Sequence, residues 1–395
     1  MSEQARPRVL FAHPFRPFFL LLGAYAALVV LVWIAQFFGF ARLPLSMQPS
    51  LWHAHEMLFG MVGAAIAGFL LTAMCNWTGA PPLTGRRLQA LVGLWLLGRI
   101  AMWLSGWLPA LLVALLDLAF LAVLGLHTAQ VLRRYGNRRN LFLAGIIGLL
   151  ALANLLMHAE FNGVAMTART GMVLGLNLIT LMMVVIAGRI TPAFTANWLR
   201  MQGGAPEQVR RPRRLDHAVI VSTALIVPLE LFAAPAAMVG VLALVAAALN
   251  GLRLFAWRGW LSAAQPLLWI LHLAYVWIVA ALSIKGLQPF MQAITPSLWF
   301  HVLGAGAIGT LIIGVITRVC LGHTGRPLRL MRGAVLTYVC VLAAAVLRSL
   351  GAVNAGGQYS LLVNLSAVLW AGAFSLFVLL YWPILTRPRP DGRPG

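Results

Sequence analysis

The chain has 395 residues, of which 61% are apolar and only 9% are charged. Soluble proteins carry about 25% charged residues, so this composition excludes a soluble globular protein and indicates an integral membrane protein. The formal net charge of +21 comes almost wholly from arginine, since Lys285 is the one lysine. Because the arginines lie between apolar segments, they favour anionic lipid headgroups of the lipid bilayer as partners, and no nucleic acid.

Apolar segments long enough to cross a bilayer recur along the chain and predict an all-α, polytopic membrane helical bundle. In hydrocarbon every backbone amide must be bonded internally, so each span needs about 20 apolar residues. We expect a single integral membrane domain over residues 1–395 with about 12 transmembrane helices. The spans lie near residues 17–39, 52–75, 87–105, 109–131, 141–161, 170–192, 217–234, 236–257, 266–285, 297–318, 333–350 and 360–382.

The basic residues are distributed unevenly between the two sides of this predicted bundle. Most of them lie at the two termini and in the loops after even-numbered spans, including Arg133, Arg134 and the run RRPRR at 210–214. Positive loops mark the cytoplasmic side, so we expect both termini to be cytoplasmic. The loops are too short to fold as separate domains, and any chemistry must therefore occur within the bundle.

Titratable side chains gather at the predicted outer level of the membrane. They are His53, His55 and Glu56 at the start of the second span, His158 and Glu160 at the end of the fifth, and His301 at the start of the tenth. Ionisable groups inside a bilayer are costly and functional by default, and imidazole is a common ligand of heme iron and copper. We therefore favour metal binding over the alternative that each histidine only caps or hydrates a helix end.

His53 and His55 lie close together in the segment LWHAHEMLFG. On a regular helix they point about 200° apart, so they cannot readily bind one metal together. They would serve two different centres, or one would bind a metal while the other orients its surroundings. Glu56 lies on nearly the same face as His53, where it would accept the second ring N–H of a ligand or pass a proton.

A strip of small residues follows His301 down the tenth span. Gly304, Ala305 and Gly309 lie near the face of His301, where a flat heme would rest against them. Small residues at this spacing also let membrane helices pack closely, and packing is the favoured interpretation of the strip taken alone. Because His301 stands at the head of this strip and imidazole can bind heme iron, His301 and Gly304 are nevertheless candidate heme-binding residues.

Two polar residues inside other spans are candidates for binding or proton transfer. His272 shares a polar strip of the ninth span with Tyr275 and would be a ligand or part of a proton path. Asp117 lies within the fourth span, where it would take part in proton transfer or in an ion pair.

Several long motifs resemble the NnrS family. They are HPFRPFF at 13–19, WHAHEMLFG at 52–60, GRITPAFTANWL at 188–199 and WFHVLGAGAIGTLIIGVITRVCLGHTGRPL at 299–328. The resemblance implies a protein of the bacterial inner membrane that contains heme and copper and is linked to denitrification and to defence against nitric oxide. The chain has no CxxCH motif, so the heme would be b-type and not covalently attached. The resemblance puts forward as ligands His53, His55, His158, His272, His301 and His323.

A heme and copper protein that handles nitric oxide is our leading hypothesis, with nitric oxide reduction as its enzymatic form. Glu56, with Glu160 or Asp117, would bring protons as the catalytic groups, and quinol or a redox partner would supply electrons. One alternative is a metal or heme transporter, although we find no convincing internal repeat of the kind that such folds often show. Another is a non-catalytic heme-based sensor or scaffold.

Overall fold

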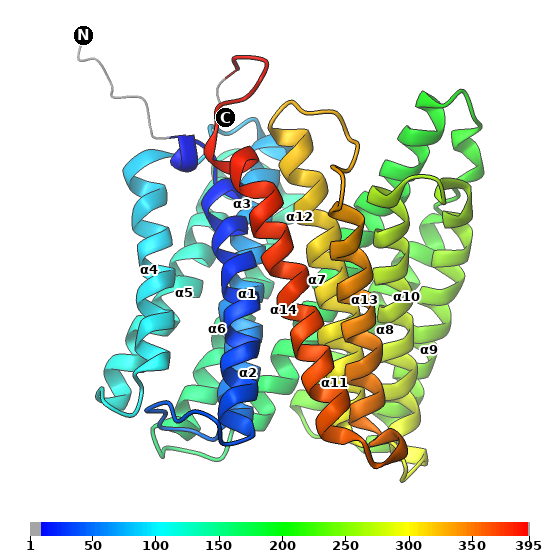
Figure 1. Cartoon of the computed structure of the whole chain (residues 1–395). Helices are drawn as coiled ribbons and strands as arrows, with labels where there is room; N and C mark the ends of the chain where they lie inside the picture. Colours follow the sequence, from blue (N-terminus) through cyan, green and yellow to red (C-terminus); the bar gives the residue numbers. More distant parts are fainter. Residues whose placement is uncertain (1–8, 394–395) are drawn as a thin grey trace. The chain divides into compact units, whose positions relative to one another are not determined.

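A computed structural model describes residues 9–393 of the chain, and over these residues it contains helices and no strand (Figure 1). The predicted all-α class is therefore confirmed. The α-helices are α1 (Phe15–Phe37), α2 (Pro49–His55), α3 (Val62–Thr78), α4 (Gly85–Trp103), α5 (Ala110–Arg134), α6 (Leu141–Phe161), α7 (Ala168–Met201), α8 (Arg213–Leu231), α9 (Ala236–Ala256), α10 (Pro266–Leu287), α11 (Pro296–His301), α12 (Gly309–His323), α13 (Ala334–Ala352) and α14 (Tyr359–Thr386).

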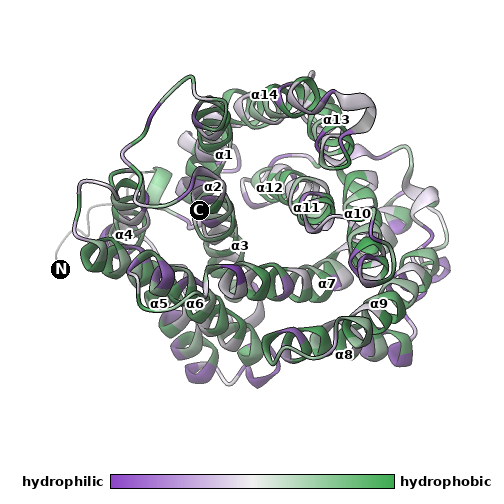
Figure 2. Ribbon diagram, turned by 90° about the horizontal axis from the view of Figure 1, so that it is seen from below, coloured by the Kyte–Doolittle hydropathy of each residue, from purple (hydrophilic) through white to green (hydrophobic). Residues whose placement is uncertain are grey.

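Ten helical segments of the described chain are long and apolar enough to cross a membrane. Two of them join short helices that are continuous in space, α2 with α3 and α11 with α12. α4 and α8 also coincide with predicted spans but carry more charge, including Arg99 in α4 and Asp216 and Glu230 in α8. Most of the helical ribbon is hydrophobic when the helices are seen end-on (Figure 2). The chain is thus a multi-pass membrane protein.

Both joined spans are interrupted by π-helix. α2 continues through a π-helical turn at Glu56–Met61 into α3, and α11 continues through Val302–Ile308 into α12. A π-helical turn holds more residues than an α-helical turn, so it changes which side chains share a face of the helix. Such turns are frequent at functional sites. Each of these two begins directly after a histidine, His55 in one case and His301 in the other.

Local sequence signals set the ends of these helices. Pro49, Pro266 and Pro296 occupy the start of α2, α10 and α11, where the missing N–H of proline would have had no partner in the helix. Gly79 ends α3 with a φ of 71°, a left-handed conformation that favours glycine. Pro49 and Pro296 therefore fix where the two interrupted helices begin, a short distance before His55 and His301.

The chain divides into two compact units. Unit 1 comprises residues 1–175, 316–328 and 374–395, and unit 2 comprises residues 176–315 and 329–373. Within unit 1, α5 packs against α3, α4 and α6, and α1 packs against α2 and α3. Within unit 2, α9 packs against α8 and α10, and α10 packs against α11 and the second π-helical turn. The expectation of a single membrane domain stays a prediction.

Candidate metal centre

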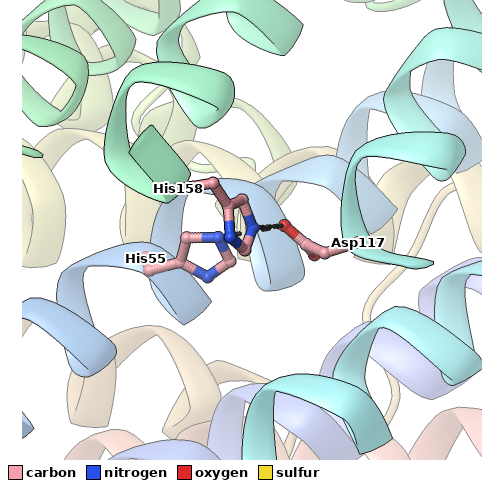
Figure 3. A group of neighbouring side chains, drawn as sticks. All are labelled: His55, Asp117 and His158. Atoms are coloured by element: carbon pink, nitrogen blue, oxygen red, sulfur yellow. Dashed lines mark hydrogen bonds and ion pairs between the residues drawn. The ribbon is translucent and has the colours of Figure 1, made fainter. Parts of the chain in front are cut away.

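His55, Asp117 and His158 come together in the interior of unit 1, from α2, α5 and α6 (Figure 3). All three side chains are buried. The Nε2 atoms of both histidines face the same carboxylate oxygen, Oδ2 of Asp117, at 3.0 Å for His55 and 2.9 Å for His158. One ligand atom from each residue lies within 4.8 Å of the other two, so a single metal ion could contact all three.

Asn154 adds an amide to this group. Its Nδ2 donates a hydrogen bond to Oδ2 of Asp117 at 2.7 Å, and its Oδ1 lies 2.8 Å from Nε2 of His55. Asn154 precedes His158 by one helical turn on α6, so both side chains reach the cluster from the same face. Two imidazoles, one carboxylate and one amide oxygen therefore converge on one point.

Glu56 contacts the other ring nitrogen of His55, Nδ1, and Arg99 contacts Glu56. Oε1 of Glu56 lies 3.0 Å from Nδ1 of His55, and Nη1 of Arg99 donates to the same oxygen at 2.5 Å. Nη2 of Arg99 donates to Oδ1 of Asp117. One guanidinium group thus spans the two carboxylates and fixes the position of both.

The donor set of this cluster fits a metal ion. His55 has a carboxylate oxygen beside each ring nitrogen, but a neutral imidazole has only one N–H to donate. With neutral histidines, two carboxylates against one guanidinium also leave the buried group with one net negative charge. A cation held by Nε2 of His55 and by Asp117 would remove both conflicts, because Nδ1–H would then donate to Glu56. Carboxylate, histidine and metal are often arranged in this order.

The first π-helical turn helps to shape the cluster. Trp95 on α4 donates its indole N–H to the carbonyl oxygen of Gly60 within this turn, at 3.0 Å. A methyl group on Gly60 would lie only 2.9 Å from Nη1 of Arg99, so the glycine leaves room for the guanidinium. The interruption of the helix and the position of Arg99 are therefore linked.

His53 and Glu160 lie apart from the cluster. The ring of His53 stacks on Trp33 of α1, with ring centroids 4.2 Å apart. Oε2 of Glu160 accepts a hydrogen bond from the backbone N–H of Ala168 at 2.8 Å, at the start of α7. These contacts do not bring His53 or Glu160 to the His55 cluster. A metal-binding role for His53 and a catalytic role for Glu160 therefore stay predictions.

His323 lies at the end of α12 within unit 1, where its ring centroid is 6.0 Å from that of His13. Hydroxyl Oγ1 of Thr72 is 3.4 Å from Nδ1 of His13. Burial, followed by the nearby His323 and Arg16, lowers the pKa of His13 to about 4. His13 is therefore neutral near pH 7, and among residues 9–393 no third His, Cys, Asp or Glu is spaced to share an ion with this pair.

The remaining predicted residues, His272, His301 and Gly304, belong to unit 2. His272 on α10 is buried, with Nε2 3.0 Å from Oγ1 of Thr195 and with no hydrogen-bond partner at Nδ1. His301 ends α11 and Gly304 lies in the second π-helical turn. The predicted layer of four histidines is thus distributed over several local environments, and of the four only His55 and His158 meet.

Arg99 is the charged residue of the cluster that the sequence did not point to. An arginine inside an apolar helix is itself a signal, because a buried charge requires a partner. Two acidic residues inside other predicted spans could form an ion pair with it, Glu56 and Asp117. The sequence did not show that one arginine would contact both.

Fold and site together define a multi-pass membrane protein with a buried histidine–carboxylate cluster that is suited to a metal ion. The family model of the NnrS protein matches residues 9–389, nearly the whole chain. The protein belongs to the NnrS family, and the resemblance seen in its motifs is confirmed. A comparison with curated proteins gave no match.

Proposed function

We propose that this protein is a heme- and metal-containing membrane protein that binds nitric oxide, with a non-heme metal held by His55, Asp117 and His158. The observation that carries the proposal is the single carboxylate oxygen of Asp117 shared by the Nε2 atoms of both histidines. The cluster lies within membrane-spanning helices, where an apolar gas such as nitric oxide concentrates. Membership of the NnrS family supports a role related to nitric oxide.

Copper is the metal that we propose for the cluster. Imidazole nitrogens suit copper and iron, and the carboxylate and amide oxygens of Asp117 and Asn154 suit the divalent forms of these metals. When bound, the ion would supply an open coordination position for nitric oxide and a redox-active centre. The heme, of b type, would be held elsewhere in the chain.

The protein's own residues would orient and shield this centre. Glu56 would accept the Nδ1–H of His55 and keep Nε2 directed at the ion, while Arg99 holds both carboxylates in place. Water is excluded from the two histidines, which are buried, and the ring of Phe161 lies beside both, with centroids 6.3 Å from His55 and 5.8 Å from His158. In such a dry setting electrostatic interactions are stronger.

Glu56 is the proton-carrying group that we propose for the enzymatic form of this function. Its Oε1 is engaged by His55 and Arg99, but its Oε2 is buried without a hydrogen-bond partner. Reduction of nitric oxide to nitrous oxide consumes one proton for each electron. A carboxyl group beside the metal would deliver these protons. Asp117, engaged by two histidines, would act as ligand. Quinol or a redox partner would supply the electrons.

We also propose that the protein lies in the bacterial inner membrane with both termini in the cytoplasm. The arginine-rich loops after even-numbered spans support this orientation, because basic residues mark the cytoplasmic side.

Metal analysis of purified variants tests the proposed function. We expect His55→Ala and His158→Ala to lose the non-heme metal, and His53→Ala, on the same helix but stacked on Trp33, to keep it. Anaerobic consumption of nitric oxide with a quinol donor should follow the metal content. Unchanged metal content in both cluster variants would refute the assignment. Full metal and nitric oxide binding without turnover would favour the sensor alternative over the enzyme.

A further inference from the structure

Arg348 is a buried arginine near the end of α13. The residue is 8% exposed, and its Nη1 atom is buried without a hydrogen-bond partner. Within residues 9–393, no hydrogen bond or ion pair joins its guanidinium group to the protein. A charge inside a membrane span is costly and is normally paired. An arginine in this setting therefore indicates a partner that comes from outside the chain.

Three other buried arginines show how this protein usually satisfies such a charge. Arg16 donates to backbone carbonyls at the end of α14, Arg99 contacts two carboxylates, and Arg253 contacts the carboxylate of Asp216. Each of these guanidinium groups has oxygen acceptors that the protein supplies. Arg348 is nearly as deeply buried but has no such acceptor in the described part of the chain.

The acidic side chains of the protein are engaged elsewhere. The chain has eight Asp and Glu residues, of which Glu3 lies outside the described residues. Six others have partners different from Arg348, namely Glu56, Asp117, Glu160, Asp216, Glu230 and Asp391. The last, Glu207, is exposed in a turn after α7. Residues 9–393 thus supply no carboxylate to Arg348.

Arg348 lies where α13 meets the start of α14. The hydroxyl group of Ser366 on α14 donates a hydrogen bond to the carbonyl oxygen of Ala344 on α13 at 2.7 Å, which joins the two helices. A methyl group on Gly351 would lie 3.8 Å from Nη1 of Arg348 and 3.0 Å from Val363 on α14. The guanidinium group is therefore packed at the contact between the helices and does not extend into water.

The position of Arg348 along α13 matches the depth of lipid headgroups. Arg348 precedes Ala352, the last residue of the helix, by four residues. At a rise of 1.5 Å per residue it lies about 6 Å inside the end of the helix, from where a long arginine side chain reaches the headgroup region. The surface around this end of α13 and the start of α14 is apolar, since Leu350, Val353 and Leu361 are 41% to 53% exposed. An oxyanion that carries acyl chains fits both features.

We infer that Arg348 binds the phosphate group of a membrane phospholipid at the contact between α13 and α14. The guanidinium group would donate charge-assisted hydrogen bonds to the phosphate oxygens, for which its planar fork is suited. The acyl chains would lie against the exposed apolar side chains. A free phosphate ion would match the charge of Arg348 but not the apolar surface. The site is separate from the His55 cluster and does not depend on the proposed function.

Thermal unfolding of the full-length protein in a non-ionic maltoside detergent tests the inference. The probes, added separately, are phosphatidylglycerol, a diacylglycerol with the same acyl chains but no phosphate, and inorganic phosphate. We expect phosphatidylglycerol to raise the unfolding midpoint of the wild type more than the other two, and Arg348→Gln to lose most of this difference. The affinity for the lipid, measured by native mass spectrometry, should fall by about 10-fold or more, as charge-assisted hydrogen bonds are lost. Arg169→Gln is the matched control and should keep the full response, because Arg169 is exposed at the start of α7.

Arg348→Leu gives a second readout, of opposite sign. In lipid-free detergent an unpaired buried charge destabilises the fold, so we expect a higher unfolding midpoint in Arg348→Leu than in the wild type. With phosphatidylglycerol this difference should shrink or reverse, because the lipid stabilises the wild type alone through Arg348. A lower midpoint of Arg348→Leu in lipid-free detergent would show that the protein itself satisfies the guanidinium group, and it would overturn the inference.

The lipid responses can also contradict the inference. Equal responses of the wild type and Arg348→Leu to phosphatidylglycerol would exclude Arg348 as the binding residue, even if Arg348→Gln does not fold. Equal responses of the wild type to phosphatidylglycerol and diacylglycerol would exclude the phosphate group as the recognised feature. Stabilisation by inorganic phosphate alone would mean that the ligand is a free anion and not a lipid.

Discussion

The two interrupted helices have the same local backbone but differ in the charges around them. The first π-helical turn begins with a buried carboxylate, Glu56, which shares the guanidinium of Arg99 with a second one, Asp117. Near the second interrupted helix, Lys285 lies 3.9 Å from the ring centroid of Trp299 and pairs with one carboxylate, that of Glu230, at 2.7 Å. The first cluster has two carboxylates for one guanidinium and lacks a positive charge, whereas Lys285 and Glu230 balance each other.

This difference in charge gives the two turns different requirements for a cation. A buried group with a net negative charge is costly unless a cation or a proton neutralises it, so the first turn favours a metal ion. Near the second turn the Lys285–Glu230 pair is balanced and requires no further charge, and a methyl group on Gly304 would meet no neighbouring atom within 4 Å.

Removal of Arg99 should have the largest effect. Arg99→Gln leaves Glu56 and Asp117 buried together, and loss of one partner of a buried ion pair costs about 3–5 kcal/mol of unfolding free energy. Lys285→Gln is the matched change and should cost less, because the side chain of Glu230 is 26% exposed and can be hydrated. Unfolding of both variants in detergent measures the contrast. Equal losses would show that the two clusters do not differ in this way.

Asp117→Asn should separate metal binding from stability. The change removes the shared ligand oxygen, so we expect metal affinity to fall by more than about 100-fold, the upper end for changes outside the ligand shell. It also removes the excess negative charge of the cluster, so the metal-free variant should unfold no more easily than the metal-free wild type. Metal titration and thermal unfolding give the two readouts. A variant that keeps the metal would exclude Asp117 as ligand.

Glu56→Gln should have a smaller effect on metal binding, because Glu56 acts through His55. We expect affinity for the metal to fall by about 10–100-fold, as for other carboxylates that orient a histidine ligand. Turnover of nitric oxide, where present, should fall further because a proton carrier is lost. Glu160→Gln is the control, since Glu160 bonds to the start of α7 and not to the cluster. Similar losses in both variants would argue against a specific role for Glu56.

Much of the fold could be predicted because each span is a continuous apolar run bounded by charged or turn residues. Each of the twelve predicted spans overlaps a helix, counting each interrupted helix once, and ten of these segments are long and apolar enough to cross a membrane. The π-helical turns could not be predicted in this way. They depend on tertiary contacts such as the hydrogen bond from Trp95 to the carbonyl of Gly60, and no periodic pattern marks them.

The site was predicted less completely for a geometric reason. The distribution of basic residues gives the orientation of the spans, and position along an oriented span then placed His53, His55 and His158 at one level. It does not give the direction of a side chain around the helix or the neighbours of that helix. The packing of α5 against α6 brings Asp117 to His158, whereas His53 turns toward α1.

The glycines of the two turns allow the smallest and most direct test of the comparison. Gly60→Ala should weaken metal binding and lower stability by about 1 kcal/mol, because the new methyl group would force Arg99 to move from its position 2.9 Å away. Gly304→Ala meets open space, so in heme-free protein it should stabilise the helix by about 0.5–1 kcal/mol through the restricted backbone of alanine. Opposite signs in unfolding experiments would show that the charged network fills the space at Gly60 while the space at Gly304 is unfilled. A loss of stability in Gly304→Ala equal to that in Gly60→Ala would mean that the second turn is as closely packed as the first.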